Sequence, residues 1–261
     1  MLEDEAAALC RIKADLASRG TGAHLEEAVP EGLGALHAFA RANPVYDGSE
    51  EAVLAGTGCT IYRGDIGGYW LGSTKHGGTC QPFYPTWMAS ARIISGMAKR
   101  LGYAEVVDVG SGDGRIAYCA AAAGLGAHSV EIDPDLAGLQ GRIFGATGSP
   151  VTIHCADALS ADYGAMGLSR PLFVVGALPQ MGGDILASGV IGAARGTGAP
   201  AGILLAGSLE SRGLAAGGGD GGWSGVLGSH GLRPDPAVHL PTYWTHDRQH
   251  DTPYIHASLA T

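Results

Sequence analysis

The sequence lacks several features that would assign a protein to a class at once. It has no Lys- or Arg-rich run, and its 25 acidic and 16 basic residues give a formal net charge of −9. A net-acidic chain without a basic cluster is poorly suited to hold a polyanion, so the composition makes nucleic acid an unlikely main substrate. The five cysteines are scattered without a C-x-x-C pair, which favours reduced thiols in a cytosolic protein.

Long apolar runs are also missing. The apolar stretches are short and interrupted by glycine, so the sequence predicts no membrane span. The N-terminus, Met1 to Glu5, is acidic where a secretory signal would be basic, and we therefore expect a cytoplasmic protein. Glycine, by contrast, is abundant at 44 residues, but its dispersed placement excludes a collagen-like sequence.

Two patterns divide the 261 residues. The first part mixes apolar residues at helical spacing with a strand-like, glycine-rich stretch. We expect residues 1–82 to form an N-terminal extension or cap and residues 83–261 to form the main domain. The elements expected in the extension are helices at 2–19 and 25–42 and a hairpin at 54–72 that turns at 63–65.

From residue 105 onward, strand-like and helix-like segments alternate. Such alternation predicts a parallel sheet covered by helices on both faces, and two final strands would complete a doubly wound, seven-stranded α/β sheet. A helix through residue 100 precedes it, with Thr86 as its expected N-cap. The expected strands are 105–109, 127–132, 151–155, 171–176, 200–206, 237–241 and 254–259, and the clearest helices between them are 134–142 and 184–194.

The most informative stretch is residues 106–115, Val-Val-Asp-Val-Gly-Ser-Gly-Asp-Gly-Arg. A β-branched run leads into a Gly-x-Gly-x-Gly turn, and an alanine-rich helix follows directly. Glycines permit positive φ and let the backbone lie against a ligand, while the amides at the helix start face whatever occupies the turn. The dinucleotide fingerprint would need glycine where Arg115 stands.

An acidic residue marks the tip of the second expected strand. Glu131 suits the two hydroxyls of a ribose, because a carboxylate can accept a hydrogen bond from each. Turn, helix, second strand and acid together resemble the S-adenosylmethionine site of class I methyltransferases. Two alternatives remain at this point: a nucleotide or dinucleotide binder of related fold, and a βαβ unit whose tight turn holds no ligand.

The resemblance can be narrowed to a group of enzymes. The segments Tyr84-Pro85-Thr86, 107–116 (Val-Asp-Val-Gly-Ser-Gly-Asp-Gly-Arg-Ile) and 130–134 (Val-Glu-Ile-Asp-Pro) look like those of the archaeal protein-lysine methyltransferases. These are small class I enzymes similar to the non-SET histone-lysine methylases. The resemblance covers roughly residues 83–160. It implies a Rossmann-like methyltransferase sheet, S-adenosylmethionine as cofactor and a protein lysine as methyl acceptor.

The resemblance also implies roles for the residues of the turn. Asp108, at the end of the first strand, would contact the amino group of the cofactor directly or through water. The residues that would line the methionine moiety and its carboxylate are Gly110, Ser111, Gly112, Asp113 and Gly114.

The remaining cofactor contacts are implied in the same way. Glu131 would take the ribose hydroxyls, Asp157 would accept from the adenine amino group, and the Ala158 amide would donate to the adenine ring. Tyr84 and Thr86 would close over the methionine end, so that Tyr84 is also a candidate catalytic residue.

The methyl acceptor is less well defined. The stretch 175–181 does not contain the Asn/Asp-Pro-Pro-Tyr motif of many amino-group methylases, which argues against nucleobase and glutamine-amide methylation. A lysine amine must lose a proton before it attacks, and a weakly hydrated aromatic channel favours the neutral amine. Tyr84, Tyr69 and Trp70 are candidates for that channel. The alternative for Tyr69 and Trp70 is that they pack the extension onto the sheet.

A second cluster lies between the last two expected strands. His246 and His250 are four residues apart, and His246 is the second candidate catalytic residue, as a general base or substrate contact. We expect no metal site, because a third ligand and a glutamate base are missing, and an ordinary solvated loop is the alternative. Two further functions stay open: a small-molecule N- or O-methyltransferase with one of these histidines as base, and a non-catalytic S-adenosylmethionine-binding scaffold.

Overall fold

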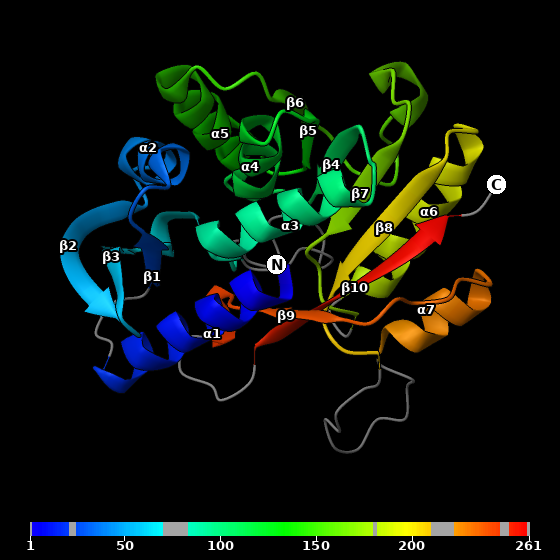
Figure 1. Ribbon diagram of the computed structural model, residues 1–261. Helices are drawn as coiled ribbons and strands as arrows, with labels where there is room; N and C mark the ends of the chain where they lie inside the picture. The colour runs from blue at the N-terminus through cyan, green and yellow to red at the C-terminus, as the bar shows by residue number, and fades with distance from the viewer. Residues whose placement is uncertain are drawn as a thin grey trace.

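The computed structural model describes residues 2–20, 25–69, 83–179, 182–209, 222–245 and 251–259. Within these ranges the largest sheet has seven strands in the order β6-β5-β4-β7-β8-β10-β9 (Figure 1). The first five in sequence are parallel, whereas β10 runs antiparallel to both β8 and β9. The strands are β4 (Glu105–Val109), β5 (Gly126–Glu131), β6 (Thr152–Cys155), β7 (Pro171–Val175), β8 (Ala201–Ala206), β9 (Val238–Leu240) and β10 (Thr252–Leu259). The predicted doubly wound, seven-stranded α/β sheet is confirmed.

Helices cover both faces of this sheet. Val106 packs into one hydrophobic core, while Val107 and Val109 pack into a second on the other face. The strands at the centre are buried on both sides, which is why β7 and β8 read as continuous apolar runs. The first core is closed by α3 (Met88–Arg100), α4 (Arg115–Ala122) and α5 (Pro134–Thr147), and the second by α6 (Gly183–Gly196) and α7 (Trp223–Ser229).

Two expected helix caps have different outcomes. Asp133 caps α5 by accepting from the amide of Asp135 at 2.8 Å, and Pro134 occupies the first helical position as predicted. The prediction that Thr86 caps α3 is wrong, because the N-cap is Trp87 and it makes no side-chain capping bond. The hydroxyl of Thr86 instead lies 2.5 Å from the hydroxyl of Tyr254 on β10, a distant partner that the local sequence does not reveal.

The extension begins with α1 (Leu2–Ser18), as predicted. The helix expected at 25–42 is only half right, because its first six residues form β1 (Leu25–Pro30) and only α2 (Gly34–Ala42) is helical. Strand β1 is buried along most of its length and pairs antiparallel with β3 (Thr57–Gly64). Burial of both faces in a sheet therefore overrides the helical spacing of the apolar residues.

The hairpin of the extension turns at a different place from the one predicted. Strands β2 (Tyr46–Leu54) and β3 are joined at Ala55 and Gly56, whose φ angles are 48° and 78°. Positive φ at both central residues is the geometry that suits a two-residue hairpin turn. The expected turn at 63–65 is wrong, since residues 63 and 64 still belong to β3. The exposed edge strand β2 lacks the apolar alternation that would have marked it as a strand.

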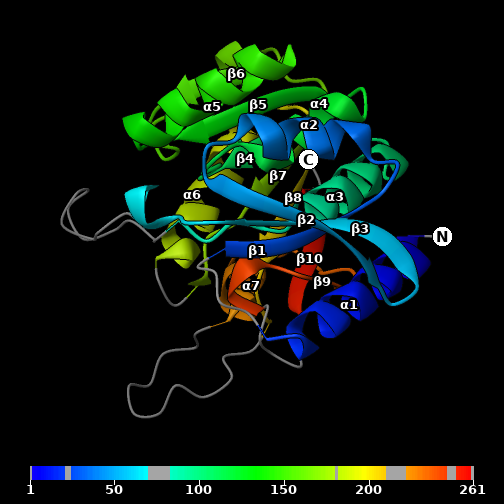
Figure 2. The ribbon, with the colours of Figure 1, turned by 90° about the vertical axis from the view of Figure 1, so that its left-hand side faces the viewer.

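The extension packs against one end of the main sheet, on the left in Figure 1 and nearest the viewer in Figure 2. Helix α2 packs on α4 and α5, and α1 packs on α3 and β9. Leu9, Phe39 and Ile61 of the extension share one buried core with Ile94 and Tyr118 of the main domain. The division of the chain at residue 82 stays a prediction. Among the described residues, no helix has the length and apolarity needed to cross a membrane.

Candidate active site

The candidate site lies at the carboxyl end of β4, where the predicted glycine turn leads into α4. Strand β4 pairs with β5 on one side and with β7 on the other, so the strand order reverses at this point. Ligands of open parallel sheets bind outside the carboxyl ends of the strands at such a reversal. The fold therefore places the turn where a ligand is expected.

The turn has the backbone geometry that its glycines allow. The φ angles of Gly110, Gly112 and Gly114 are 67°, 60° and 78°, a region that is costly for residues with a side chain. The amides of Gly110 and Ser111 donate to the carbonyl of Val130 on β5 at 2.9 and 3.2 Å. These bonds hold the turn against the tip of the neighbouring strand.

The three glycines face different surroundings. A Cβ at Gly112 would lie 2.7 Å from the ring of Phe83, and one at Gly114 would lie 2.6 Å from the ring of Phe144. A Cβ at Gly110 would meet nothing within 4 Å. Packing thus requires glycine at 112 and 114, whereas Gly110 presents its backbone to open space.

Glu131 joins the turn to the end of β5. Its Oε2 accepts from the Gly112 amide at 2.7 Å and its Oε1 from the Asp133 amide at 2.9 Å. Burial raises the pKa of Glu131, and the bonds from these amides oppose that rise. Each carboxylate oxygen has a second lone pair, so the group can still accept from a ligand.

Asp108 is a buried carboxyl at the end of β4. Its Oδ2 accepts from the amide of Ala117 in the first turn of α4 at 3.3 Å. Burial raises the pKa of Asp108 well above its usual range, and the neighbouring charges of Asp113 and Glu131 raise it further. A cation placed beside Asp108 would be stabilised by the ionised form.

Asp113 does not present its carboxylate to open space. It is fully buried, and its Oδ2 accepts from Asn43 Nδ2 at 2.9 Å and from Arg115 Nη2 at 2.6 Å. Arg115 Nε also donates to the Oδ1 of Asp113 at 2.9 Å. The side chain of Asp113 is therefore used within the protein, and only its backbone is left for the predicted contact with a methionine moiety.

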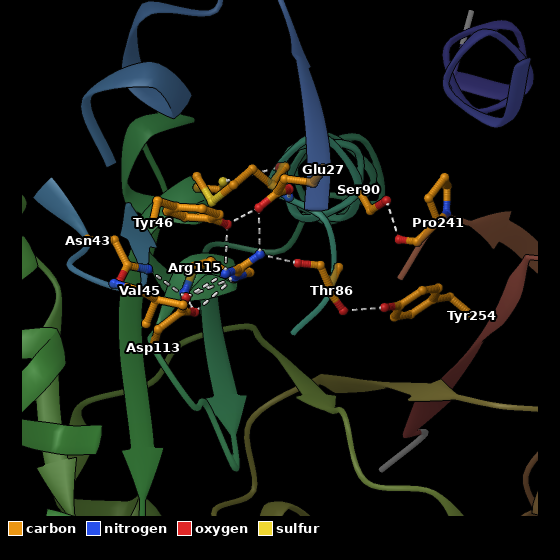
Figure 3. Close-up of polar contacts among 12 residues, drawn as sticks. Glu27, Asn43, Val45, Tyr46, Thr86, Ser90, Asp113, Arg115, Pro241 and Tyr254 are labelled. Carbon is orange, nitrogen blue, oxygen red and sulfur yellow. Dashed lines mark hydrogen bonds and ion pairs between the residues drawn. The ribbon is translucent and has the colours of Figure 1, made fainter. Parts of the chain in front are cut away.

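Arg115 is the central residue that the sequence analysis missed (Figure 3). Its Nη1 donates to Glu27 Oε1 at 3.0 Å and to the carbonyl of Thr86 at 2.6 Å, and its Nη2 donates to the Tyr46 hydroxyl at 3.1 Å. Tyr46 in turn donates to Glu27. Burial opposes the charge of Arg115, but Asp113, Tyr46 and Glu27 raise its pKa overall, so it is a buried cation. The available signal was an arginine directly after the last glycine of the turn.

The segment 84–86 lies close to the turn, as the resemblance implied. Thr86 is buried, accepts from Arg115 and forms an isolated bridge with Thr242 before β10. Tyr84 stacks on Tyr243, with ring centroids 6.0 Å apart and planes at 21°, and the Tyr243 amide donates to the carbonyl of Pro85 at 2.9 Å. Arg115 thus brings Thr86 to the glycine turn, and Tyr84 lies beside the connection between β9 and β10.

The predicted adenine contacts follow β6. The Ala156 amide donates to the carbonyl of Glu131 at 2.9 Å, which places this loop beside the ribose candidate. Asp157 is exposed, and its Oδ1 accepts from the Leu159 amide at 2.9 Å. Ala158 is buried, and its carbonyl accepts from the Tyr163 hydroxyl at 2.9 Å.

The other acceptor-side candidates are only partly covered by the structure. Tyr69 packs against the first core, and its hydroxyl accepts from Arg142 at 3.4 Å, which favours the packing interpretation. His246, His250 and Trp70 lie outside the described residues. Within the ranges that are described, no three His, Cys, Asp or Glu side chains are grouped so as to hold a metal ion.

Comparison with known proteins gives one partial sequence relative. No protein-family profile matches the chain. A segment of 79 residues is 46% identical to the ribosomal RNA small subunit methyltransferase A of Rubrobacter xylanophilus. This segment covers 30% of the present chain and 28% of that protein, so the two share a part and not their whole length.

Two solved structures with similar folds are also methyltransferases by name. Magnesium protoporphyrin IX methyltransferase from Synechocystis PCC 6803, with bound S-adenosylmethionine, is 15% identical with a TM-score of 0.48 over 66% of this chain and 77% of its own. The 1,6-didemethyltoxoflavin-N1-methyltransferase of Burkholderia thailandensis is 17% identical with a TM-score of 0.47 over the same shares. The sheet order and register define the fold independently of these likenesses.

Proposed function

We propose that this chain is an S-adenosylmethionine-dependent methyltransferase. The observation that carries the proposal is the glycine turn at the carboxyl end of β4, open at Gly110 and flanked by the buried carboxyls of Asp108 and Glu131. The segment that is 46% identical to a methyltransferase supports the same reaction class.

Each part of the cofactor has a matching group in this arrangement. Gly110, whose backbone faces open space, suits the methionine moiety, Asp108 suits the ammonium, and Glu131 suits the ribose hydroxyls. Asp157 and the Ala158 amide are assigned to adenine, as the resemblance implies. When bound, the cofactor supplies a methyl group already activated by the sulfonium. The chain therefore has to align the acceptor lone pair with that methyl and keep water away.

For the methyl acceptor we propose the side-chain amine of a protein lysine. The stacked rings of Tyr84 and Tyr243 offer an apolar surface to the alkyl chain of a lysine. Burial raises the pKa of Tyr243, and the nearby Tyr84 and Asp65 raise it further, so Tyr243 stays a neutral phenol beside an acidic side chain. The same apolar surface favours the neutral amine that must attack. The net charge of −9 supports a cationic acceptor over ribosomal RNA.

The experiment that tests the proposal has two stages. Isothermal titration of the purified chain with S-adenosylmethionine is expected to give micromolar binding, and a folded protein that binds none would contradict the proposed function. Methyl-labelled cofactor is then incubated with separated protein, RNA and small-molecule fractions of a cell extract. Label in the protein fraction and on the enzyme itself is expected. Label confined to small molecules would replace the lysine proposal by a small-molecule methyltransferase, and label in RNA would do so by an RNA methyltransferase.

The glycines of the turn provide a matched pair of variants. Each alanine is strained by roughly 1–2 kcal/mol at positive φ, but Gly112→Ala also collides with Phe83, which adds about 1–3 kcal/mol. We therefore expect Gly110→Ala to keep most of its thermal stability and lose cofactor binding, because its methyl group enters the ligand's space. Gly112→Ala is expected to have the lower melting temperature of the two. Equal cofactor affinity of Gly110→Ala and the unmodified chain would contradict the assigned position of the methionine moiety.

A further inference from the structure

One buried polar network connects the N-terminal extension to the glycine turn. Arg115 contacts Asp113 of the turn, Glu27 of β1, Tyr46 of β2 and the carbonyl of Thr86. Asn43, just after α2, adds a second bond to Asp113. Figure 3 shows the Glu27, Tyr46 and Asp113 side chains and the Thr86 carbonyl around the guanidinium, with Asn43 beside Asp113. The network, defined here as Glu27, Asn43, Tyr46, Asp113 and Arg115, therefore spans the extension and the candidate cofactor site.

The network is completely satisfied by its own members and neighbours. Glu27 is fully buried and accepts from Arg115, from Tyr46 and from the amide of Met88 at the start of α3. All five donors of a guanidinium point in fixed directions, so Arg115 can hold several segments at once in a way that lysine cannot. A buried charge that loses one such partner is left without water to replace it, so the loss of one partner is strongly destabilising.

The network also reaches the acceptor side of the site. Arg115 donates to the carbonyl of Thr86, and the hydroxyl of Thr86 contacts Tyr254 on β10. Ser90 of α3 donates at 2.7 Å to the carbonyl of Pro241, which lies in the connection between β9 and β10 (Figure 3). Arg115 thus links the turn to the segment before α3, and that segment in turn contacts β10 and the β9–β10 connection.

We infer that Arg115 is a positioning residue and that Glu27, Asn43 and Tyr46 make the extension an integral part of the cofactor site. The inference rests on the proposed function. Asp113 and Arg115 flank Gly114, so the network sets the end of a turn whose three glycines all have positive φ. A turn that adopts its binding geometry only part of the time binds more weakly by that fraction. Loosening the network therefore weakens cofactor binding without touching the cofactor.

Strand β1 contains a matched pair for the test. Glu26 and Glu27 are adjacent, and their exposed fractions are 2% and 0%. Each is paired with an arginine. Glu26 pairs with Arg63 of β3 at 2.7 Å, entirely within the extension, whereas Glu27 pairs with Arg115 at 3.0 Å. Glu26→Gln therefore removes the same chemistry from the same strand without reaching the turn.

The readouts are the affinity for S-adenosylmethionine by titration and the hydrogen exchange of amides 110–114, each measured where circular dichroism shows a folded chain. Glu27→Gln is expected to bind about tenfold more weakly or worse, corresponding to a turn that is competent at most one-tenth of the time. It is also expected to exchange those amides faster. Glu26→Gln is expected to match the unmodified chain in both. Tyr46→Phe, which removes one hydroxyl, replaces Glu27→Gln if that variant does not fold.

The outcomes separate the inference from the proposed function. If the unmodified chain binds no cofactor, the proposed function fails, and the exchange of amides 110–114 still tests the network. If the unmodified chain binds and Glu27→Gln matches Glu26→Gln in affinity and exchange, the inference is overturned. Arg115→Lys keeps the positive charge and loses the planar guanidinium with its fixed donors. Full cofactor affinity of this variant would therefore also overturn the inference.

Discussion

Replacing Asp108 by asparagine is expected to stabilise the free protein and at the same time to weaken S-adenosylmethionine binding by tenfold or more. Asp108 is buried at 2% exposure, and burial together with Asp113 and Glu131 raises its pKa well above the usual range. Asparagine is neutral at every pH, so it removes the free-energy cost of keeping a buried carboxyl protonated or of burying it charged, and the melting temperature near pH 7.5 is expected to rise by about 2–4 °C. The same change removes the negative partner assigned to the ammonium, a bond worth roughly 1.5–3 kcal/mol.

The raised pKa of Asp108 also predicts the direction in which the stability of the protein changes with pH. Because the pKa of Asp108 is raised in the folded state, the folded protein holds that proton more tightly than the unfolded chain does. The stabilisation is present at low pH and is lost as the pH rises from about 4, the unfolded value, through the raised folded value. Melting curves from pH 4 to pH 9 are expected to show this decline in the unmodified chain and a smaller decline in Asp108→Asn.

Cofactor binding is expected to release a proton from Asp108. Titrations in two buffers of different ionisation enthalpy measure that release, which is expected to be smaller or absent in Asp108→Asn. Methylthioadenosine lacks the ammonium and carboxylate of the cofactor and is the matched control ligand, because its affinity should be the same for both proteins. Asp108→Asn with unchanged affinity for S-adenosylmethionine, or with weakened affinity for methylthioadenosine, would contradict the assigned contact.

The parts of the fold that could be predicted are those with local signals. The central strands β4, β7 and β8 are largely apolar runs that are buried, and the strands β4 to β8 alternate with helices. Asp133 and Pro134 mark the start of α5 because capping is decided by neighbouring residues. Gly110, Gly112 and Gly114 mark the turn because positive φ is a property of the residue itself.

The parts that were missed depend on partners far along the chain. Nothing local in residues 25–30 shows that Glu26 and Glu27 will be buried against arginines 37 and 88 residues away, so the segment was interpreted as helical. Thr86 has the composition of a cap, but the Tyr254 hydroxyl, 168 residues away, is its actual partner. Asp113 was assigned to the cofactor from its place in the motif, whereas its carboxylate contacts Asn43 and Arg115. For Thr86 and Asp113, the position in the motif predicted where the residue lies but not which groups its side chain contacts.

Replacing Glu131 by alanine is expected to have the largest effect on cofactor affinity, a loss of about a hundredfold or more. Two hydrogen bonds from ribose hydroxyls to a buried carboxylate are worth roughly 1.5–3 kcal/mol each, and both vanish together. The variant is also expected to unfold more easily by about 1–3 kcal/mol, because the amides of Gly112 and Asp133 lose their acceptor. Titration with S-adenosylhomocysteine and chemical denaturation measure the two effects separately.

Glu105 supplies the control that separates the binding effect from the structural one. It lies at the opposite end of β4, and its Oε2 accepts from the amides of Ser169 at 3.2 Å and Arg170 at 2.9 Å, much as Glu131 accepts from two amides. Glu105→Ala is therefore expected to lose stability and keep its affinity. A further cycle uses the 2′-deoxy analogue of S-adenosylhomocysteine, which should bind the unmodified chain more weakly than S-adenosylhomocysteine does. If Glu131 accepts from the ribose, that difference disappears in Glu131→Ala, and a difference of the same size in both proteins would place the ribose elsewhere.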